Sequence, residues 1–289
     1  MIPLGKQFVS GYFLYTNIGD AYCYGDLDFY GTISDLFGET ASIVASITLE
    51  HGIQMVSVDG TVYTLANNPD KHEIPNVTKV VDAIVIDDSV AVLKAQGELV
   101  DTDGKVIIKF GSDSTDAAFL SCALSSDGSS VYALDANGCV HGGQGAQHHG
   151  DLTTIGESRA RARDFACSPW GNGYWIIDDI GGVFCFGDVD YFGSVPGDGQ
   201  TCVAQKIIPS PTGYGYWIID RRGMVLPFGD AAYCGHPKPE EVTGDVIGMV
   251  PVLRSDRRDH EWLFTQLVNN DIAQLMGDPL REFDEPIAQ

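Results

Sequence analysis

One short segment of the chain combines side chains that bind transition metals. Cys139 and His141 are two positions apart, and His148 and His149 follow shortly after. A structural zinc site needs four such ligands, usually supplied as closely spaced pairs. The chain has no second Cys/His pair at that spacing, and Cys139 and His141 flank a strand position that related segments fill with Gly, Phe or Cys. We therefore expect these side chains to be structural, and predict neither a metal site nor a cofactor.

Acidic side chains form a second group of candidates. The segment Asp101-Thr102-Asp103-Gly104 begins like a calcium-binding loop but lacks the closing Glu, which favours a hairpin turn. Four other aspartates directly follow a glycine, where a carboxylate can accept backbone N–H bonds and fix a turn. We interpret these pairs as structural turns: Gly25-Asp26, Gly187-Asp188, Gly229-Asp230 and Gly277-Asp278.

A repeated phrase indicates which elements position these residues. It reads Tyr-Trp-Ile-Ile-Asp at 174–178 and at 216–220, and each copy closes with a Gly-Asp pair ten residues after that Asp. A third strong copy runs from 12 to 26, weaker copies match its turn glycine, and a stretched copy lies in the last part of the chain. A period shared by distant segments indicates a repeat architecture. The seven copies begin near residues 12, 53, 90, 131, 174, 216 and 261.

Each copy predicts β-strands, because Tyr, Trp, Ile, Val and Phe occur in short runs closed by Gly, Asp, Asn or Pro. In the fifth copy we expect four strands, at residues 164–168, 173–178, 182–186 and 189–193. Four antiparallel strands per roughly 41 residues, repeated seven times, predict a seven-bladed β-propeller. We expect a single all-β domain over residues 1–289.

The recurring aromatic residues are predicted to pack between blades rather than to stack on sugars. They are Tyr12, Tyr174, Trp175, Tyr216, Trp217, Trp262, Phe186 and Phe228. To close the ring, residues 2–10 would supply the first strand of the first blade and residues 279–283 the last strand of the seventh. A terminal strand exchanged between the two ends of the chain is the competing possibility.

The first strands of a propeller line its central channel, where an enzyme would gather acids, bases or nucleophiles. The expected triplets, such as 43–45, 83–85, 119–121, 165–167 and, at the start of the seventh blade, 247–249, are apolar and small. They show no Ser/His/Asp order, histidine cluster or carboxylate pair. We therefore predict no catalytic residue and expect that the protein is not an enzyme.

The charge of the chain restricts its partners. With 17 Lys and Arg against 40 Asp and Glu, the formal net charge is −23. Nucleic acids and anionic membranes attract proteins of the opposite sign, so neither is expected as a partner. Arg159, Arg161 and Arg163 are interpreted mainly as solvated loop charges, with docking on an acidic neighbour as the alternative. The sequence has no run of 18 apolar residues, so membrane insertion is not expected.

The N-terminal segment and the cysteines indicate a compartment. Residues 1–10 lack the apolar run of a secretory leader, so we expect synthesis and folding in a cytoplasm. An odd number of cysteines, seven, argues against a disulfide framework, and free thiols are predicted.

The phrase also resembles a known repeat family. Gly173-Tyr174-Trp175, Gly181-Gly182-Val183-Phe184 and Phe186-Gly187-Asp188 are similar to the "GYW…DGG(V/I)F.FGDA.FYGS" repeat of actinobacterial secreted proteins and of proteins from phages that infect those bacteria. The resemblance is close in the first, fifth and sixth copies and loose in the others. It implies a β-propeller and carries over no catalytic residue.

Together these observations lead to a functional expectation. A leaderless, acidic propeller of this family fits a minor tail protein in a bacteriophage virion, which docks on other virion proteins and contacts a glycan or protein of the host cell envelope. Two alternatives stay open. One is a carbohydrate-binding, lectin-like propeller with exposed aromatics near its loop ends. The other is a propeller glycosidase or esterase with paired carboxylates in a pocket.

Overall fold

A computed structural model describes residues 9–49, 52–111, 117–143, 145–155, 161–170 and 172–253. The chain divides into two compact parts, residues 1–253 and 254–289, and everything described below belongs to the first. The seventh copy of the phrase, at 261–278, therefore lies outside the described residues, as do Trp262, Gly277 and Asp278. Within the described ranges, no helix has the length and apolar character needed to cross a membrane.

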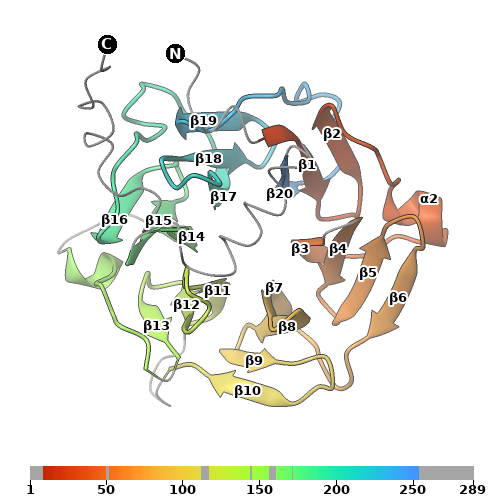
Figure 1. Cartoon of the computed structure of the whole chain (residues 1–289), viewed down its shortest axis with the longest axis horizontal. Coiled ribbons are helices and arrows are strands. Elements are labelled where there is room, and N and C mark those ends of the chain that lie inside the picture. Colours follow the sequence, from red (N-terminus) through yellow and green to blue (C-terminus); the bar gives the residue numbers. More distant parts are fainter. Residues whose placement is uncertain are drawn as a thin grey trace, which may run out of the picture. The chain divides into compact units, whose positions relative to one another are not determined.

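The described residues form six small antiparallel sheets, which we name A to F (Figure 1). Sheet A contains β1 (Val9–Thr16), β2 (Ala21–Gly25) and β20 (Val246–Leu253). Sheet B contains β3 (Ile43–Leu49), β4 (Gly52–Ser57), β5 (Thr61–Leu65) and β6 (Asp70–Glu73). Sheet C contains β7 (Val80–Ile86), β8 (Ser89–Lys94), β9 (Glu98–Val100) and β10 (Val106–Lys109).

The remaining three sheets have three strands each. Sheet D contains β11 (Phe119–Leu124), β12 (Val131–Asp135) and β13 (Val140–Gly142). Sheet E contains β14 (Ala162–Cys167), β15 (Gly173–Asp178) and β16 (Val183–Gly187). Sheet F contains β17 (Ala204–Pro209), β18 (Gly215–Asp220) and β19 (Val225–Gly229). Two short helices lie in the described residues: α2 (Ile33–Phe37), between sheets A and B, and η1 (Leu152–Thr154), between sheets D and E.

The prediction of an all-β fold built from small antiparallel sheets is confirmed. Six copies of the phrase begin in, or directly beside, the middle strand of a sheet: β1, β4, β8, β12, β15 and β18. The phrase reads as strand because both faces of these segments are apolar. Every residue of β15 and of β18 is buried, as expected when a strand is packed on both sides.

The prediction of a fourth strand at residues 189–193 is wrong, because this segment is a loop. Side chains, rather than a neighbouring strand, bind its backbone. The indole Nε1 of Trp175 donates to the carbonyl oxygen of Asp190 over 2.8 Å, and the hydroxyl of Tyr216 accepts a bond from the N–H of Phe192 at 3.2 Å. These bonds satisfy the backbone groups that a strand ladder would otherwise use.

The strand that completes sheet A comes from far along the chain. β20 pairs with β1 in antiparallel fashion, with Leu14 opposite Met249 and Phe13 opposite Val250. Residues 247–249 were expected to begin the seventh blade, and residues 2–10 were expected to supply the first strand of the first. In the described residues β20 takes the place beside β1, whereas residues 2–8 and 279–283, which were expected to close the ring, lie outside the described residues.

The first strands of successive sheets contact one another. β3 contacts β7, β7 contacts β11, β11 contacts β14, and β14 contacts β17. β20 contacts both β17 and β3. Six apolar clusters fill the spaces, and most combine side chains of two neighbouring sheets, as Trp175, Ile177, Ile207 and Ile218 do for sheets E and F. The hydrophobic core is therefore distributed between the sheets.

Candidate functional site

The repeat tyrosines join neighbouring sheets. Tyr12, Tyr174 and Tyr216 are at most 1% exposed, and each lies in a middle strand. Each hydroxyl donates a 2.6 Å hydrogen bond to a glycine carbonyl in the loop that follows the preceding sheet: Gly235, Gly150 and Gly193, respectively. Burial, the largest influence, raises the pKa of all three phenols. The three phenols therefore make structural contacts between neighbouring sheets.

The other recurring aromatics are also buried. Trp175 and Trp217 bind the loop of their own sheet, since their Nε1 atoms donate to Asp190 O and Ala232 O at 2.8 and 2.7 Å. Phe186 and Phe228 are 8% and 6% exposed, and each packs beside the Tyr of its own sheet with ring centroids 6.0 and 5.7 Å apart. None of these four side chains is presented for sugar stacking.

The glycine–aspartate pairs lie where the third strands end. Gly25, Gly187 and Gly229 have positive φ angles of 102°, 84° and 65°, which glycine adopts readily. Asp26, Asp188 and Asp230 donate their own N–H groups to Ser10, Asn172 and Tyr214 carbonyls. The Asp230 carboxylate accepts bonds from the hydroxyls of Ser210 and Thr212. The backbone N–H bonds expected for these carboxylates are made instead by aspartates of the hairpin turns, such as Asp178 and Asp220.

Three charged side chains meet where the first strands come together. Lys206 Nζ on β17 lies 3.1 Å from Asp82 Oδ2 on β7 and 3.1 Å from Asp164 Oδ1 on β14. They line a cavity of about 290 Å³ together with residues of β3, β11 and β20. The expectation that the first strands contain no carboxylate pair is therefore wrong.

A bulge explains why sequence reasoning missed this group. The pairing of β7, β14 and β17 skips one residue just before Asp82, Asp164 and Lys206. The same skip occurs before Ala45 and Ser121. A bulge changes the face on which a side chain points. Asp82, Asp164 and Lys206 each directly precede the apolar residues of a first strand. This shared place in three copies was the sequence signal that could have identified them.

The carboxylates also connect neighbouring sheets. Asp82 Oδ2 accepts the N–H of Cys122 on β11 at 3.1 Å, and Asp164 Oδ2 accepts the N–H of Ile207 on β17 at 3.0 Å. Burial lowers the pKa of Lys206, but Asp164 and Asp82 outweigh burial and hold this pKa above its usual value. The ammonium group is therefore charged and bound to both carboxylates. With their oxygens occupied in this way, the two acids serve to hold sheets together.

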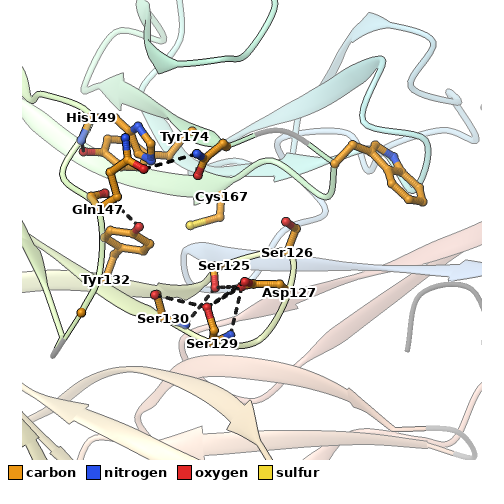
Figure 2. A pocket seen from close by; sticks show the side chains of 14 residues that line it. Ser125, Ser126, Asp127, Ser129, Ser130, Tyr132, Gln147, His149, Cys167 and Tyr174 are labelled. Carbon is orange, nitrogen blue, oxygen red and sulfur yellow. Dashed lines mark hydrogen bonds between the residues drawn. The ribbon is translucent and has the colours of Figure 1, made fainter. Parts of the chain in front are cut away.

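A second cavity, of about 400 Å³, opens between sheets D and E (Figure 2). Its walls are the turn between β11 and β12, the loop between β13 and η1, and the residues around the start of β15. Its lining residues are Ser125, Ser126, Asp127, Ser129, Ser130, Tyr132, Gly145, Gln147, His149, Cys167, Trp170, Asn172, Gly173 and Tyr174. Hydroxyl, amide and carboxylate groups thus face aromatic rings across an open pocket, and Trp170 is 39% exposed.

The polar groups of this pocket are held in place by one another. Asp127 Oδ1 accepts bonds from Ser125 Oγ at 2.6 Å and from Ser129 N at 3.0 Å, as Figure 2 shows. These bonds lower the pKa of Asp127, the bond from Ser125 having the largest effect. Tyr132 donates to Gln147 O at 3.0 Å. The hydroxyls of Ser125 and Ser129 therefore both donate to the carboxylate of Asp127.

The residues first considered for metal binding come together in part. Cys139 and His141 lie within 4.8 Å of each other and of Asp135, measured between potential ligand atoms. His148 lies beside Asp151, whereas His149 packs against Tyr174. Sequence reasoning missed Asp135 and Asp151, because a turn and a returning loop bring them to this place. The thiols of Cys23, Cys122, Cys139, Cys167, Cys185 and Cys202 form no disulfide in the described residues.

Neither a protein-family model nor a curated protein matches this chain.

Proposed function

We propose that the six sheets form a β-propeller that is closed by β20. The order of contacts among the first strands, with β20 touching both β17 and β3, supports this arrangement. The proposed propeller has six blades, rather than the seven expected from the copies of the phrase. The reason is that residues 247–249, which were expected to start a seventh blade, complete the first sheet.

We further propose that the protein is a non-enzymatic binding module, and that the cavity between sheets D and E takes a carbohydrate of the host cell envelope. The observation that carries this proposal is the lining of the cavity. Serine, asparagine, glutamine and aspartate groups can pair with sugar hydroxyls, and a partly exposed indole offers an apolar face for a sugar ring. The ordered hydrogen bonds around Asp127 prepare these groups before a ligand arrives.

Catalysis is the less favoured function of the same molecule. A glycosidase needs one carboxylic acid and one carboxylate that are free to react. Asp82 and Asp164 share Lys206 and accept backbone N–H bonds, so neither is arranged as a free acid. In the open cavity, Asp127 is bound by serine hydroxyl and backbone groups.

A place in the virion follows from the resemblance of the repeat to phage proteins, and an exposed aromatic position supports docking on another virion protein. Phe29, Tyr191 and Tyr233 each lie four residues after the glycine of a Gly-Asp pair, and they are 50%, 57% and 51% exposed. Aromatic residues are enriched in protein interfaces. We assign these three positions to contacts with other tail proteins, made after synthesis in the host cytoplasm.

Two measurements test the proposal. Titration with purified cell-envelope polysaccharide should give saturable binding that Trp170→Ala weakens about tenfold or more, equivalent to about 1.4 kcal/mol. Tyr233→Ala is the matched control, because it removes an exposed aromatic outside the cavity and should leave glycan binding unchanged. Absence of binding to any envelope glycan, or turnover of the polysaccharide, would contradict a non-enzymatic glycan-binding function. Absence of the protein from purified particles would contradict the virion assignment.

A further inference from the structure

The hairpin between β12 and β13 differs chemically from its equivalents in the neighbouring sheets. In sheets D, E and F an aspartate begins this turn, and its Oδ1 accepts the N–H groups two and four residues later. The distances are 2.9 and 3.0 Å for Asp135, 3.1 and 2.6 Å for Asp178, and 2.8 and 2.8 Å for Asp220. The turn itself therefore needs only the aspartate.

Sheet D adds two further ligand-type side chains to this shared turn. The positions four and six residues after the aspartate are Gly182 and Phe184 in sheet E, and Met224 and Leu226 in sheet F. In sheet D they are Cys139 and His141. The residues four and six positions after the aspartate are two apart along the strand, so their side chains point to the same side of the sheet. The potential ligand atoms of Asp135, Cys139 and His141 all lie within 4.8 Å of one another.

A fourth group reaches the same place from the loop that follows sheet D. Asp151 is the N-cap of η1, and the Cys139 thiol donates a hydrogen bond to its carboxylate. The Oδ1 atom of Asp151 is fixed by the N–H of Thr153 at 3.0 Å. The corresponding residue in sheet E is Ser194, which has no carboxylate. The fourth potential ligand is thus also specific to sheet D.

The two carboxylates are buried and oriented. Asp135 and Asp151 are 1% and 2% exposed. Oδ1 of each is held by backbone N–H groups, and Asp135 Oδ2 lies 2.9 Å from His141 Nε2. Asp151 Oδ2 lies 3.2 Å from His148 Nε2 and accepts the N–H of Val140 on β13 at 3.3 Å. In the part of the chain that the structure describes, these histidines are their ion-pair partners, and neither carboxylate pairs with a lysine or arginine. Two buried carboxylates so close to a thiol favour a bound cation.

We propose that Asp135, Cys139, His141 and Asp151 bind a zinc ion. One thiolate, one imidazole and two carboxylates form a four-ligand set of the kind that tetrahedral zinc accepts. The 2.9 Å between Asp135 Oδ2 and His141 Nε2 is close to the separation of about 3.3 Å that two ligands take around zinc. The ligand atoms of Asp135, Cys139 and His141 already lie within 4.8 Å of one another, whereas the carboxylate of Asp151, which accepts the Cys139 thiol, would have to move toward the ion. His148 would act as an outer partner that orients Asp151.

The site is structural in character. It would tie the β12–β13 hairpin to η1, because three ligands belong to the hairpin and the fourth begins the helix. Binding to the folded state alone stabilises that state in proportion to the logarithm of free metal over its dissociation constant. The loop between these elements also carries Gln147 and His149 of the open cavity, so the metal would steady one wall of the proposed glycan site.

The test uses the full chain after treatment with a chelator. Addition of Co²⁺ should give visible absorption of a tetrahedral site and a near-ultraviolet thiolate-to-cobalt band, at one ion per chain, and Zn²⁺ should displace it. Cys139→Ser should abolish the thiolate band. His141→Gln should weaken Zn²⁺ binding by more than the roughly 10- to 100-fold loss typical of outer-partner changes. Cys185→Ser, an exposed thiol on the third strand of sheet E, is the control and should change neither signal.

A readout on the unaltered chain covers the case in which a variant does not fold. Zn²⁺ should slow alkylation of Cys139 and leave alkylation of Cys185 unchanged, as followed by mass spectrometry. Stoichiometric binding with no thiolate band, equal binding by Cys139→Ser, or no protection of Cys139 would each overturn the assignment. Because no glycan is used, these results are independent of the proposed glycan binding.

Discussion

The hydroxyl of Tyr216 and the carbonyl oxygen of Gly193 are joined by a 2.6 Å hydrogen bond that crosses from sheet F to the loop after sheet E. The same hydroxyl accepts the N–H of Phe192 at 3.2 Å. The hydroxyl of Tyr174 in sheet E donates in the same way to Gly150 in the loop after sheet D, and the hydroxyl of Tyr12 in sheet A donates to Gly235 in the loop after sheet F. At each of these three interfaces between sheets, one buried phenol thus binds backbone groups of a loop that pairs with no strand.

Removal of this hydroxyl should destabilise the fold. In Tyr216→Phe the ring remains, but partly buried backbone groups of Gly193 and Phe192 lose their partner, which costs about 0.5–1.5 kcal/mol. Urea unfolding would show a lower midpoint with an unchanged slope. Tyr214→Phe is the control, since its ring is 47% exposed, and it should change stability by less than about 0.5 kcal/mol. Equal stability of the two variants would show that the bond is dispensable.

The same phenols predict a loss of stability at alkaline pH. Burial raises the pKa of Tyr12, Tyr174 and Tyr216 in the folded state above the value of about 10 found in unfolded chains. Above that pH the unfolded state loses protons that the folded state retains, so the free energy of unfolding should fall as pH rises. The stabilisation is complete below about pH 9. Urea titrations on both sides of pH 10 would measure how steeply the free energy of unfolding falls with pH. Replacing the three tyrosines with phenylalanine should make this fall less steep.

The central charges give a third prediction. Lys206→Met would leave Asp82 and Asp164 buried without their shared cation, at a cost of about 3–5 kcal/mol. Replacing all three residues with uncharged ones should recover much of that loss, because no unpaired charge is left. Lys238→Met, which breaks an exposed pair with Glu241, should cost less than about 1 kcal/mol. A similar loss in the Lys206 and Lys238 variants would contradict the assigned role.

Sheet A gives a fourth prediction. A chain that stops after Asp245 lacks β20, so β1 loses one of its two strand partners. We expect this chain to show no cooperative thermal transition. A chain that stops after Leu253 retains β20 and should unfold cooperatively. Cooperative melting of the shorter chain would mean that β20 is an accessory strand.

Much of the fold could be predicted from the sequence because the phrase combines strand propensity with a fixed period. Its Tyr and Trp positions are buried in β1, β15 and β18, where the pattern places them. The fourth strand at 189–193 could not be excluded by pattern, since tertiary bonds from Trp175 and Tyr216 take its backbone.

The charged and metal-type groups were harder to predict. Asp82, Asp164 and Lys206 stand at the same place in three sheets, but a bulge, which has no clear sequence signal, brings them to the centre. Asp135 reads as an ordinary turn residue. Its proximity to Cys139 and His141 arises from the tight hairpin, while Asp151 arrives through a loop of irregular structure.

The pairing of β1 with β20 also sets an order on assembly in the cell. β1 leaves the ribosome before the other described strands, but β20, one of its two partners in sheet A, is synthesised after all the strands of sheets B to F. Until translation reaches residue 253, one edge of β1 is unpaired and open to other chains. Nascent protein should therefore rely on chaperones during elongation, and pauses late in translation should increase aggregation more than pauses early in it.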